Sequence, residues 1–525
     1  MQADFDAIII GAGMGGLAAA ARLARLDHRV LLLERHTVPG GYGSSFVRGR
    51  FEFEIALHQI SPPLAGGRPR PFHGVLEGLG MLESLEFHPL PLFYRSHFPD
   101  LDLRVPAGVD GFLDALCGAF PHEADGIRAF VDLLLRVGRE LELAGDAVLP
   151  ADGSGPSLSK AAMLPVRARG LLRYAGVSVD QVLDRYVQDP AARAVITQTW
   201  GYYGMPPSTL SFLFFAAGTG IFLETGPAYV RGRSQGLSSS LVQVIEQAGG
   251  CVRTGCGVRH ILQQSGRISG VITDRDEHIR APVVVSNASP LTTCRELMDP
   301  DMVPASFWRR MRSVTVGPSS LNVYLGLDRS AAELGLVDND QWINDSYDPD
   351  RVFRGMHTLD DPSLFMATCH SHGLPELAPP GCAALTLTTL YYAEPWLRLE
   401  PQRYVDTKNR IAASMLERME ARFPGVGASI EEVEVSTPIT NMRYTGQPGG
   451  AIYGFDQPPA EAIIWRIPNQ GPIPGLFFAG AWTLPGGGFE PTLCSGYNAG
   501  NLASSWLAKQ RGPRFFGLGR REVQA

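Results

Sequence analysis

The chain has few cysteines and no pattern among them. Seven occur in 525 residues, scattered along the sequence, and none forms a C-x-x-C pair. Structural zinc sites and thiol redox motifs require closely spaced cysteines, so we predict neither a metal site nor disulfide chemistry. Reduced, unpaired thiols of this kind are typical of a cytosolic protein.

Long apolar runs and an excess of positive charge are also missing. No stretch reaches the ~20 apolar residues that a membrane-spanning helix needs; the closest, residues 210–223, is expected to line an apolar cavity or to dip into one leaflet. The formal net charge is −7, and nucleic acids bind to basic faces, so nucleic acid is not expected as a partner. Because Met1 leads almost directly into the first predicted strand, we expect no signal peptide and a cytoplasmic location.

The start of the chain has the pattern of a dinucleotide-binding unit. The β-branched run at residues 7–10 predicts a short buried parallel strand. Glycines with the G-x-G-x-x-G spacing then lead into an alanine-rich helix: Gly11, Gly13 and Gly16. Such glycines allow a tight turn, a close approach of the pyrophosphate to the helix N-terminus, and close packing of the helix on the strand. Glu34 ends the second predicted strand about twenty residues later, where a carboxylate accepts the ribose hydroxyls of the cofactor.

A second glycine pair follows where a nicotinamide dehydrogenase has no need of one. It belongs to the motif Glu-Arg-x-x-x-x-Gly-Gly at residues 34–41, and the aromatic-rich segment Phe-Glu-Phe-Glu-x-x-x-His comes next at residues 51–58. The first motif resembles that of the flavin-containing amine oxidase and phytoene desaturase superfamily. The second is similar to the form found in carotenoid isomerases and retinol saturases. This resemblance implies that residues 56–59 pass close to the isoalloxazine ring of FAD.

The stretch near the end of the chain, residues 475–499, resembles the terminal motif of the bacterial phytoene desaturases. Residues 480–488 have the motif Gly-Ala-x-Thr-x-Pro-Gly-x-Gly. An apolar strand followed by a glycine-rich helix start closes a flavin site, because the helix amides meet the ring edge that carries negative charge when reduced. Leu484 stands where that subgroup usually has a histidine, so the resemblance leaves the substrate open. Residues 231–288 resemble the second half of the family's flavin domain.

The resemblance implies FAD as the cofactor and spreads its binding residues over the whole chain. The expected binding residues are Gly11, Gly13, Met14, Gly15, Gly16, Glu34 and Arg35; Gly40, Gly41, Tyr42, Ser44, Ser45, Leu57 and His58; Val258 and Ala288; and Gly480, Ala481, Gly487, Gly488, Glu490, Pro491 and Thr492.

The motifs and the length of the chain, which exceeds that of a single core, imply an α/β fold of more than one domain. We expect a two-domain flavoprotein with a Rossmann-like FAD-binding domain, a mixed-sheet substrate domain and a helical insertion. The predicted boundaries are 1–80, 228–295 and 446–508 for the FAD-binding domain, 81–227 for a helical insertion facing substrate and membrane, 296–445 for the substrate domain, and 509–525 for a basic tail. The tail is expected either to touch an anionic membrane surface or to be a solvated end.

The resemblance implies desaturation, isomerisation or saturation of carbon–carbon bonds in a long apolar polyene or isoprenoid. Flavin exchanges a hydride with carbon without needing an ionisable group on the substrate, provided that a dry slot aligns that carbon with the ring. Proton transfer then falls to polar groups near the ring, for which the candidates are His58, Tyr203 and Glu224. Glu224 is a candidate because it ends an apolar run, where desolvation raises the pKa of a carboxyl group. The sequence has no second dinucleotide motif for NADPH, which favours desaturation or isomerisation and leaves the electron donor or acceptor open.

Two other functions are compatible with the same scaffold. One is an amine oxidase, and the other is a prenyl-binding escort, because the GDP-dissociation-inhibitor proteins share this fold without using flavin. The intact glycines at the C-terminal motif favour a flavoenzyme over the escort. His370 and His372 flank one serine but have no third ligand nearby in sequence, so we predict surface histidines rather than a metal site.

Overall fold

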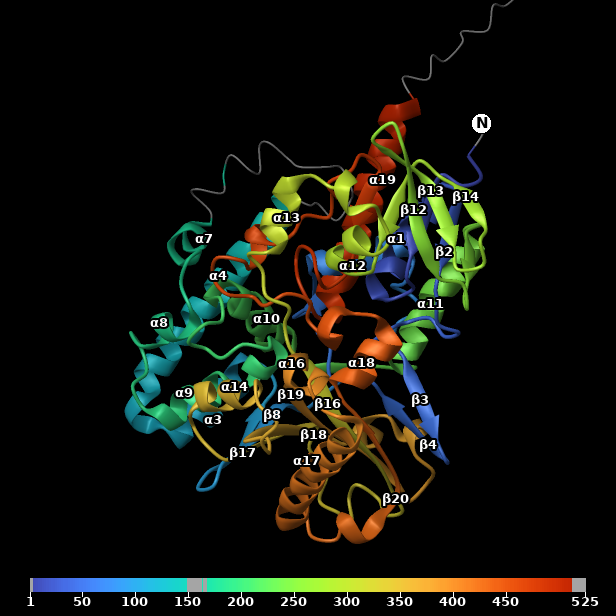
Figure 1. Cartoon of the computed structure of the whole chain (residues 1–525). Coiled ribbons are helices and arrows are strands. Elements are labelled where there is room, and N and C mark those ends of the chain that lie inside the picture. Colours follow the sequence, from blue (N-terminus) through green and yellow to red (C-terminus); the bar gives the residue numbers. More distant parts are fainter. Residues whose placement is uncertain (1–2, 149–162, 164–167, 512–525) are drawn as a thin grey trace, which may run out of the picture.

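The computed structural model describes residues 3–148, 163 and 168–511 (Figure 1). The predicted basic tail lies outside the described residues from residue 512 onward. Among the described residues, no helix is both long and apolar enough to cross a membrane. All seven cysteines carry free thiols.

A parallel sheet of five strands forms the first layer system. Its strands lie in the order β11 (Cys251–Arg253), β2 (Val30–Leu33), β1 (Ala7–Ile10), β15 (Val284–Ser286) and β21 (Leu476–Phe478). Every pair of neighbours is parallel, and the side chains of β1 and β2 are buried on both faces. Burial on both faces explains why these strands are continuous apolar runs rather than alternating ones.

Helices cover one face of this sheet and a smaller sheet covers the other. The helices that share a core with it are α1 (Met14–Ala24), α2 (Pro71–Leu79), α11 (Arg233–Gln247) and α19 (Phe489–Arg511). The opposite face packs on the antiparallel strands β12 (Val258–Gln264), β13 (Arg267–Thr273) and β14 (His278–Arg280) and on α13 (Ala305–Met311). The beginning and the end of the described chain, α1 and α19, lie side by side (Figure 1).

A mixed sheet of seven strands forms the second layer system. Its strands lie in the order β20 (Ile430–Ser436), β16 (Ser319–Leu327), β19 (Ala383–Tyr391), β18 (Leu364–Thr368), β17 (Asp340–Asn344), β8 (Leu92–His97) and β9 (Asp102–Pro106). The long helix α17 (Pro401–Arg422) packs on one face through Ile411, Met415 and Met419 (Figure 1). The other face packs against the helices of residues 109–225.

The predicted helical insertion at residues 81–227 is wrong at its beginning. Residues 87–106 form strands: β7 (Phe87–Pro89) pairs with β10 (Ala228–Val230), and β8 runs parallel to β17 in the mixed sheet. These strands are short and gain their pairing partners from distant segments, so their local pattern is weak. Helices follow from residue 109: α3 (Val109–Ala119), α4 (Ala124–Val148), α7 (Arg169–Tyr174), α8 (Val179–Leu183), α9 (Pro190–Ile196) and α10 (Phe212–Thr225).

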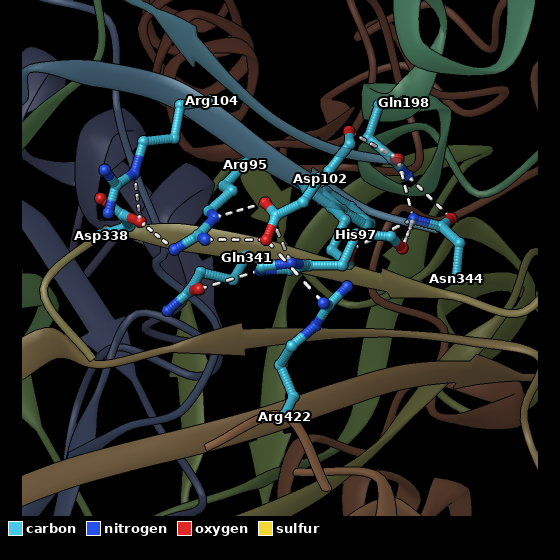
Figure 2. Close-up of polar contacts among 11 residues, drawn as sticks. Arg95, His97, Asp102, Arg104, Gln198, Asp338, Gln341, Asn344 and Arg422 are labelled. Carbon is cyan, nitrogen blue, oxygen red and sulfur yellow. Dashed lines mark hydrogen bonds and ion pairs between the residues drawn. The ribbon is translucent and has the colours of Figure 1, made fainter. Parts of the chain in front are cut away.

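A partly buried polar network joins the β8–β9 hairpin to β17 and the residues just before it (Figure 2). Arg95 donates to both carboxylate oxygens of Asp102, at 2.8 and 2.9 Å, and to Asp338 at 2.7 Å. His97, which is fully buried, lies between Gln341 and Asp102. Burial lowers the pKa of His97, so the ring is neutral at neutral pH. The network explains how a hairpin from the first third of the chain becomes part of the mixed sheet.

Candidate functional site

One large cavity, of about 1700 Å³, runs between the two layer systems. Its wall includes residues from both glycine-rich ends of the chain, for example Gly13 and Gly487, which are nearly the whole sequence apart. It also includes side chains from the mixed sheet and from α4 and α10. The cavity therefore has a half formed by the parallel-sheet unit and a half formed by the helical and mixed-sheet parts.

The first half has the features of a pyrophosphate site. Helix α1 begins after its N-cap residue Gly13. No side chain caps this helix start, and the first turn contains no acidic residue. The free amides at such a helix start attract an anion. The second glycine loop lies against the first, because the Gly40 amide donates to the carbonyl of Ala12 at 2.8 Å and Gly40 forms a bridge with Gly13. Gly41 has a φ of +59°, which favours glycine at this position.

Glu34 lies at the carboxyl end of β2 and lines the cavity. Its Oε2 accepts the Ala12 amide at 2.6 Å, and its Oε1 accepts the His36 amide at 2.7 Å. Both bonds orient the carboxylate and join the first glycine turn to the end of the second strand. A carboxylate held in this way can accept ribose hydroxyls and repel an additional phosphate.

The far end of the same half is formed by the C-terminal motif. An added Cβ at Gly487 would lie 2.6 Å from the Cα of Tyr453, so only glycine fits there. Glu490, in the first turn of α19, accepts from the buried Arg70 at 2.8 Å and from the Ser61 hydroxyl at 2.5 Å. This ion pair fixes the start of α19 beside the cavity.

Most of the predicted cofactor residues line the cavity. Those in the wall are Gly11, Gly13, Met14, Glu34, Arg35, Gly40, Gly41, Tyr42, Ser44, Ser45, Leu57, His58, Val258, Ala288, Ala481, Gly487, Gly488, Glu490, Pro491 and Thr492. The three predicted residues outside the wall are Gly15, Gly16 and Gly480, where the backbones pack closely. An added Cβ at Gly15 would lie 2.6 Å from the amide nitrogen of Gly480, and one at Gly16 would lie 2.0 Å from the carbonyl oxygen of Gly11.

The second half of the cavity is apolar. Its wall is formed mainly by aromatic and aliphatic side chains: Phe93, Leu141, Leu171, Trp200, Phe214, Ile221, Phe222, Trp342, Met356 and Leu364. Helix α10 contributes Phe214, Ile221 and Phe222, which confirms that the run at residues 210–223 lines a cavity.

The three predicted proton-transfer candidates do not come together. His58 and Tyr203 line the cavity. Glu224 lies outside its wall, contrary to expectation, because it forms an ion pair with Arg139 at 2.5 Å near the end of α10. The Tyr203 hydroxyl lies 2.9 Å from the Thr219 hydroxyl, and burial raises its pKa.

The structure adds a buried polar cluster that the sequence did not indicate. Asp340 is 1% exposed and interacts with Tyr202, Gln59 and Thr368, and Thr368 in turn lies 3.2 Å from Nδ1 of His58. Tyr202, Gln59 and His58 line the cavity, and Asp340 and Thr368 lie behind them. The sequence signal nearest to this cluster is the tyrosine pair Tyr202 and Tyr203, of which the prediction names Tyr203, whereas Tyr202 is the one that contacts Asp340.

The prediction of surface histidines is confirmed for His372 and wrong for His370. His372 is exposed, but His370 is 3% exposed, and its Nε2 donates to the carbonyl of Leu57 at 2.9 Å. Its ring stacks on that of His58, with centroids 5.7 Å apart. Within the part of the chain that the structure describes, no group of three or more histidine, cysteine, aspartate or glutamate side chains is arranged to hold a metal ion.

The residues present fit an extended dinucleotide. An uncapped helix start, an oriented carboxylate at a strand end and two glycine segments that a Cβ would fill lie along one cavity. This arrangement can hold the pyrophosphate at α1, the adenosine ribose at Glu34 and the flavin toward Gly487 and the apolar half.

Comparison with known proteins agrees with this fit. The family described as flavin containing amine oxidoreductase matches residues 14–502. The chain is 27% identical over 513 residues to all-trans-retinol 13,14-reductase of Danio rerio, covering 91% of this chain and 82% of the relative. It is 25% identical over 530 residues to the chloroplastic prolycopene isomerase of Arabidopsis thaliana, covering 98% and 85%.

Solved structures share the fold at low sequence identity. An oxidoreductase from Methanosarcina mazei superposes with a TM-score of 0.60 at 18% identity, covering 93% of this chain and 98% of that one. Putrescine oxidase bound to putrescine superposes with a TM-score of 0.61 at 16% identity, covering 96% and 99%. The chain belongs to the flavin-containing amine oxidoreductases and is an FAD-dependent oxidoreductase.

Proposed function

We propose that this protein uses FAD to desaturate, isomerise or saturate a carbon–carbon bond in a long apolar polyene or isoprenoid. The observation that carries the proposal is the cavity itself, in which the cofactor half continues into an apolar half. The names of its relatives support a polyene substrate, since one is a retinol reductase and another is a prolycopene isomerase.

The side chains of the cavity suit a substrate without charge. The apolar wall excludes water and aligns an extended chain by contact alone, which lowers the entropic part of the barrier. FAD supplies hydride exchange at carbon when it is bound. Three polar side chains of the wall, His58, Tyr202 and Tyr203, are candidates for proton transfer.

The proposal predicts conversion of a polyene by the reduced enzyme. The FAD-loaded protein is reduced under anaerobic conditions and mixed with all-trans-retinol or prolycopene, and the products are identified by mass and by double-bond geometry. A product heavier by one H2 identifies a saturase, and unchanged mass with new geometry identifies an isomerase. The oxidised enzyme with an artificial acceptor tests for a product lighter by one H2, which identifies a desaturase.

Putrescine serves as the control substrate for the amine oxidase alternative. We expect it to leave the oxidised flavin unreduced, because the apolar half of the cavity offers little solvation to a diamine. Reduction of the flavin by putrescine, with no change in either polyene, would overturn the proposal in favour of amine oxidation.

We also propose that the apolar half opens toward a membrane. Leu172 lines the cavity and is 74% exposed, and Leu143, at the end of α4, is 54% exposed. Large exposed apolar side chains at a cavity mouth are suited to contact with lipid.

Replacing Leu172 with glutamate is expected to lower cosedimentation with liposomes several-fold. The same change at Leu397, which is equally apolar and 57% exposed on α16 (Ala393–Leu397), should have no effect. Equal cosedimentation of both variants and the unchanged protein would contradict this proposal.

A further inference from the structure

A buried carboxyl group stands behind the cavity wall and reaches two of its side chains. Asp340 begins strand β17, and its carboxyl group is held at both oxygens. Oδ2 accepts from the Tyr202 hydroxyl and, at 2.7 Å, from Nε2 of Gln59. Oδ1 lies 2.7 Å from the hydroxyl of Thr368, the last residue of β18. Oδ2 of Asp340 therefore only accepts hydrogen bonds, whereas Oδ1 can accept from the Thr368 hydroxyl or, when the acid is protonated, donate to it.

The Thr368 hydroxyl links this acid to His58, and it has only one hydrogen. It lies 3.2 Å from Nδ1 of His58 and 2.7 Å from Asp340, so it donates to one of them and accepts from the other. If Asp340 is a carboxylate, Thr368 donates to it and accepts from Nδ1–H of His58. If Asp340 is a carboxylic acid, it donates to Thr368, which donates to an unprotonated Nδ1. The protonation of Asp340 thus selects the tautomer of His58.

The surroundings keep His58 neutral in both states. Burial lowers the pKa of His58 to about 4 and that of His370, which stacks on it, to about 4. Burial raises the pKa of Asp340, although its hydrogen bonds act in the opposite direction. The titratable groups that face Asp340 are His58, His370, Tyr202 and Tyr229, and burial raises the pKa of both tyrosines. His370 is held in its own tautomer, because its Nε2–H donates to the Leu57 carbonyl.

We propose that Asp340, Thr368 and His58 form a proton relay that exchanges a proton with a carbon of the substrate double bond. This inference rests on the proposed function and deepens it by assigning the proton path. His58 lines the cavity with Nε2 as the ring nitrogen not engaged by Thr368, so it is the residue that meets the substrate. Thr368 and Asp340 act through it and are positioning residues.

The step balances when a double bond is reduced. The Nε2–H bond of His58 breaks as a C–H bond forms at one carbon, Nδ1 takes the hydroxyl proton of Thr368, and Thr368 takes the carboxyl proton of Asp340. A hydride reaches the other carbon, with the two-electron-reduced flavin as the reductant. The negative charge ends on Asp340, where Tyr202 and Gln59 donate to the carboxylate. A proton from water is then taken up at Nε2, and transfer in the reverse direction from Nδ1 through Thr368 to Asp340 restores both the Nε2–H bond and the acid. No charged imidazole is formed in the dry site.

The first test reads the tautomer of His58 in the flavin-free protein. The ¹⁵N resonances of labelled histidine are recorded from low to high pH, and the His58 signals are assigned by their loss in His58→Asn. We expect Nε2 to carry the proton at low pH and Nδ1 to carry it once the carboxyl band of Asp340, identified in infrared spectra by its absence from Asp340→Asn, has titrated. A single tautomer of His58 at every pH would overturn the relay.

The second test breaks and restores the hydroxyl link. Thr368→Val, which removes the hydroxyl at nearly constant volume, is expected to lower kcat for all-trans-retinol or prolycopene about 10²-fold with little change in KM. Thr368→Ser should recover most of this loss, and Asp340→Asn should lose the pH dependence of kcat. Thr386→Val is the matched control, because Thr386 is buried opposite Thr368 on β19 and lies outside the cavity wall.

The two proposals fail in different ways. If the unchanged protein converts neither polyene, the proposed function fails, and the tautomer measurement still decides whether the relay exists. If the unchanged protein converts a polyene and Thr368→Val does so at the rate of the Thr386→Val control, the relay is wrong and the proposed function stands.

Discussion

Replacing Gly15 with alanine is expected to lower the free energy of unfolding by about 2 kcal/mol or more. An added Cβ would lie 2.6 Å from the amide nitrogen of Gly480 and 2.7 Å from Oδ1 of Asn287, closer than real Cβ contacts come. The opposite side is also closed, because Gly496 of α19 lies against the Gly15 carbonyl. Overpacking of this kind costs about 1–3 kcal/mol when side chains give way, and more when backbone must move.

The sign of this effect is decided by the clash and not by helix propensity. Alanine is favoured over glycine inside a helix by about 1 kcal/mol, so an unclashed change would stabilise. Gly236, inside α11, is the matched control, because its nearest atom to an added Cβ is the Arg231 carbonyl oxygen at 4.0 Å. Urea unfolding of the two variants should therefore move in opposite directions, and FAD content should fall only in Gly15→Ala. If both variants were stabilised, the start and the end of the chain would not meet at Gly15.

The half of the fold that contains the glycine motifs could be predicted from local sequence patterns. The β-branched run of β1, the glycines after it and Glu34 lie within one short segment, so their spacing carries the geometry. The same holds for the glycines before α19. Strand β8 could not be found in this way, because its burial depends on β17, which is about 250 residues away in the chain.

The polar cluster of the site could not be predicted for the same physical reason. Asp340 and Thr368 are adjacent only because β17 and β18 pair in antiparallel register, and His58 reaches them from a segment about 280 residues before Asp340. Which of Tyr202 and Tyr203 faces the acid depends on how the 3-10 helix Gln198–Tyr202 directs neighbouring side chains. The spacing of residues in the sequence does not indicate that Tyr202 contacts Asp340 and that Tyr203 contacts Thr219.

Replacing Glu34 with alanine is expected to weaken FAD binding by about 1.5–3 kcal/mol, which is roughly a 10- to 150-fold increase in Kd. The loss has two sources. The carboxylate no longer accepts ribose hydroxyls, and the Ala12 and His36 amides lose their acceptor, so the glycine turn that meets the pyrophosphate is less well held. Titration of the flavin-free protein with FAD, followed by fluorescence, measures the change directly.

Two further variants separate charge from packing at this position. Glu34→Gln keeps the volume and one acceptor oxygen, so its Kd should fall between those of the unchanged protein and Glu34→Ala, because a neutral amide accepts weaker hydrogen bonds than a carboxylate. Glu277→Ala removes an exposed acid that pairs with Arg253 at 3.0 Å, beside the same sheet but outside the cavity wall, and should leave Kd unchanged. FAD affinity that is equal in all four proteins would contradict both contributions assigned to Glu34, the acceptance of ribose hydroxyls and the orientation of the glycine turn. The Glu34 carboxylate joins the end of β2 to the glycine turn that precedes α1. Its loss should therefore weaken the binding of both the ribose and the pyrophosphate at the adenosine end of the cofactor.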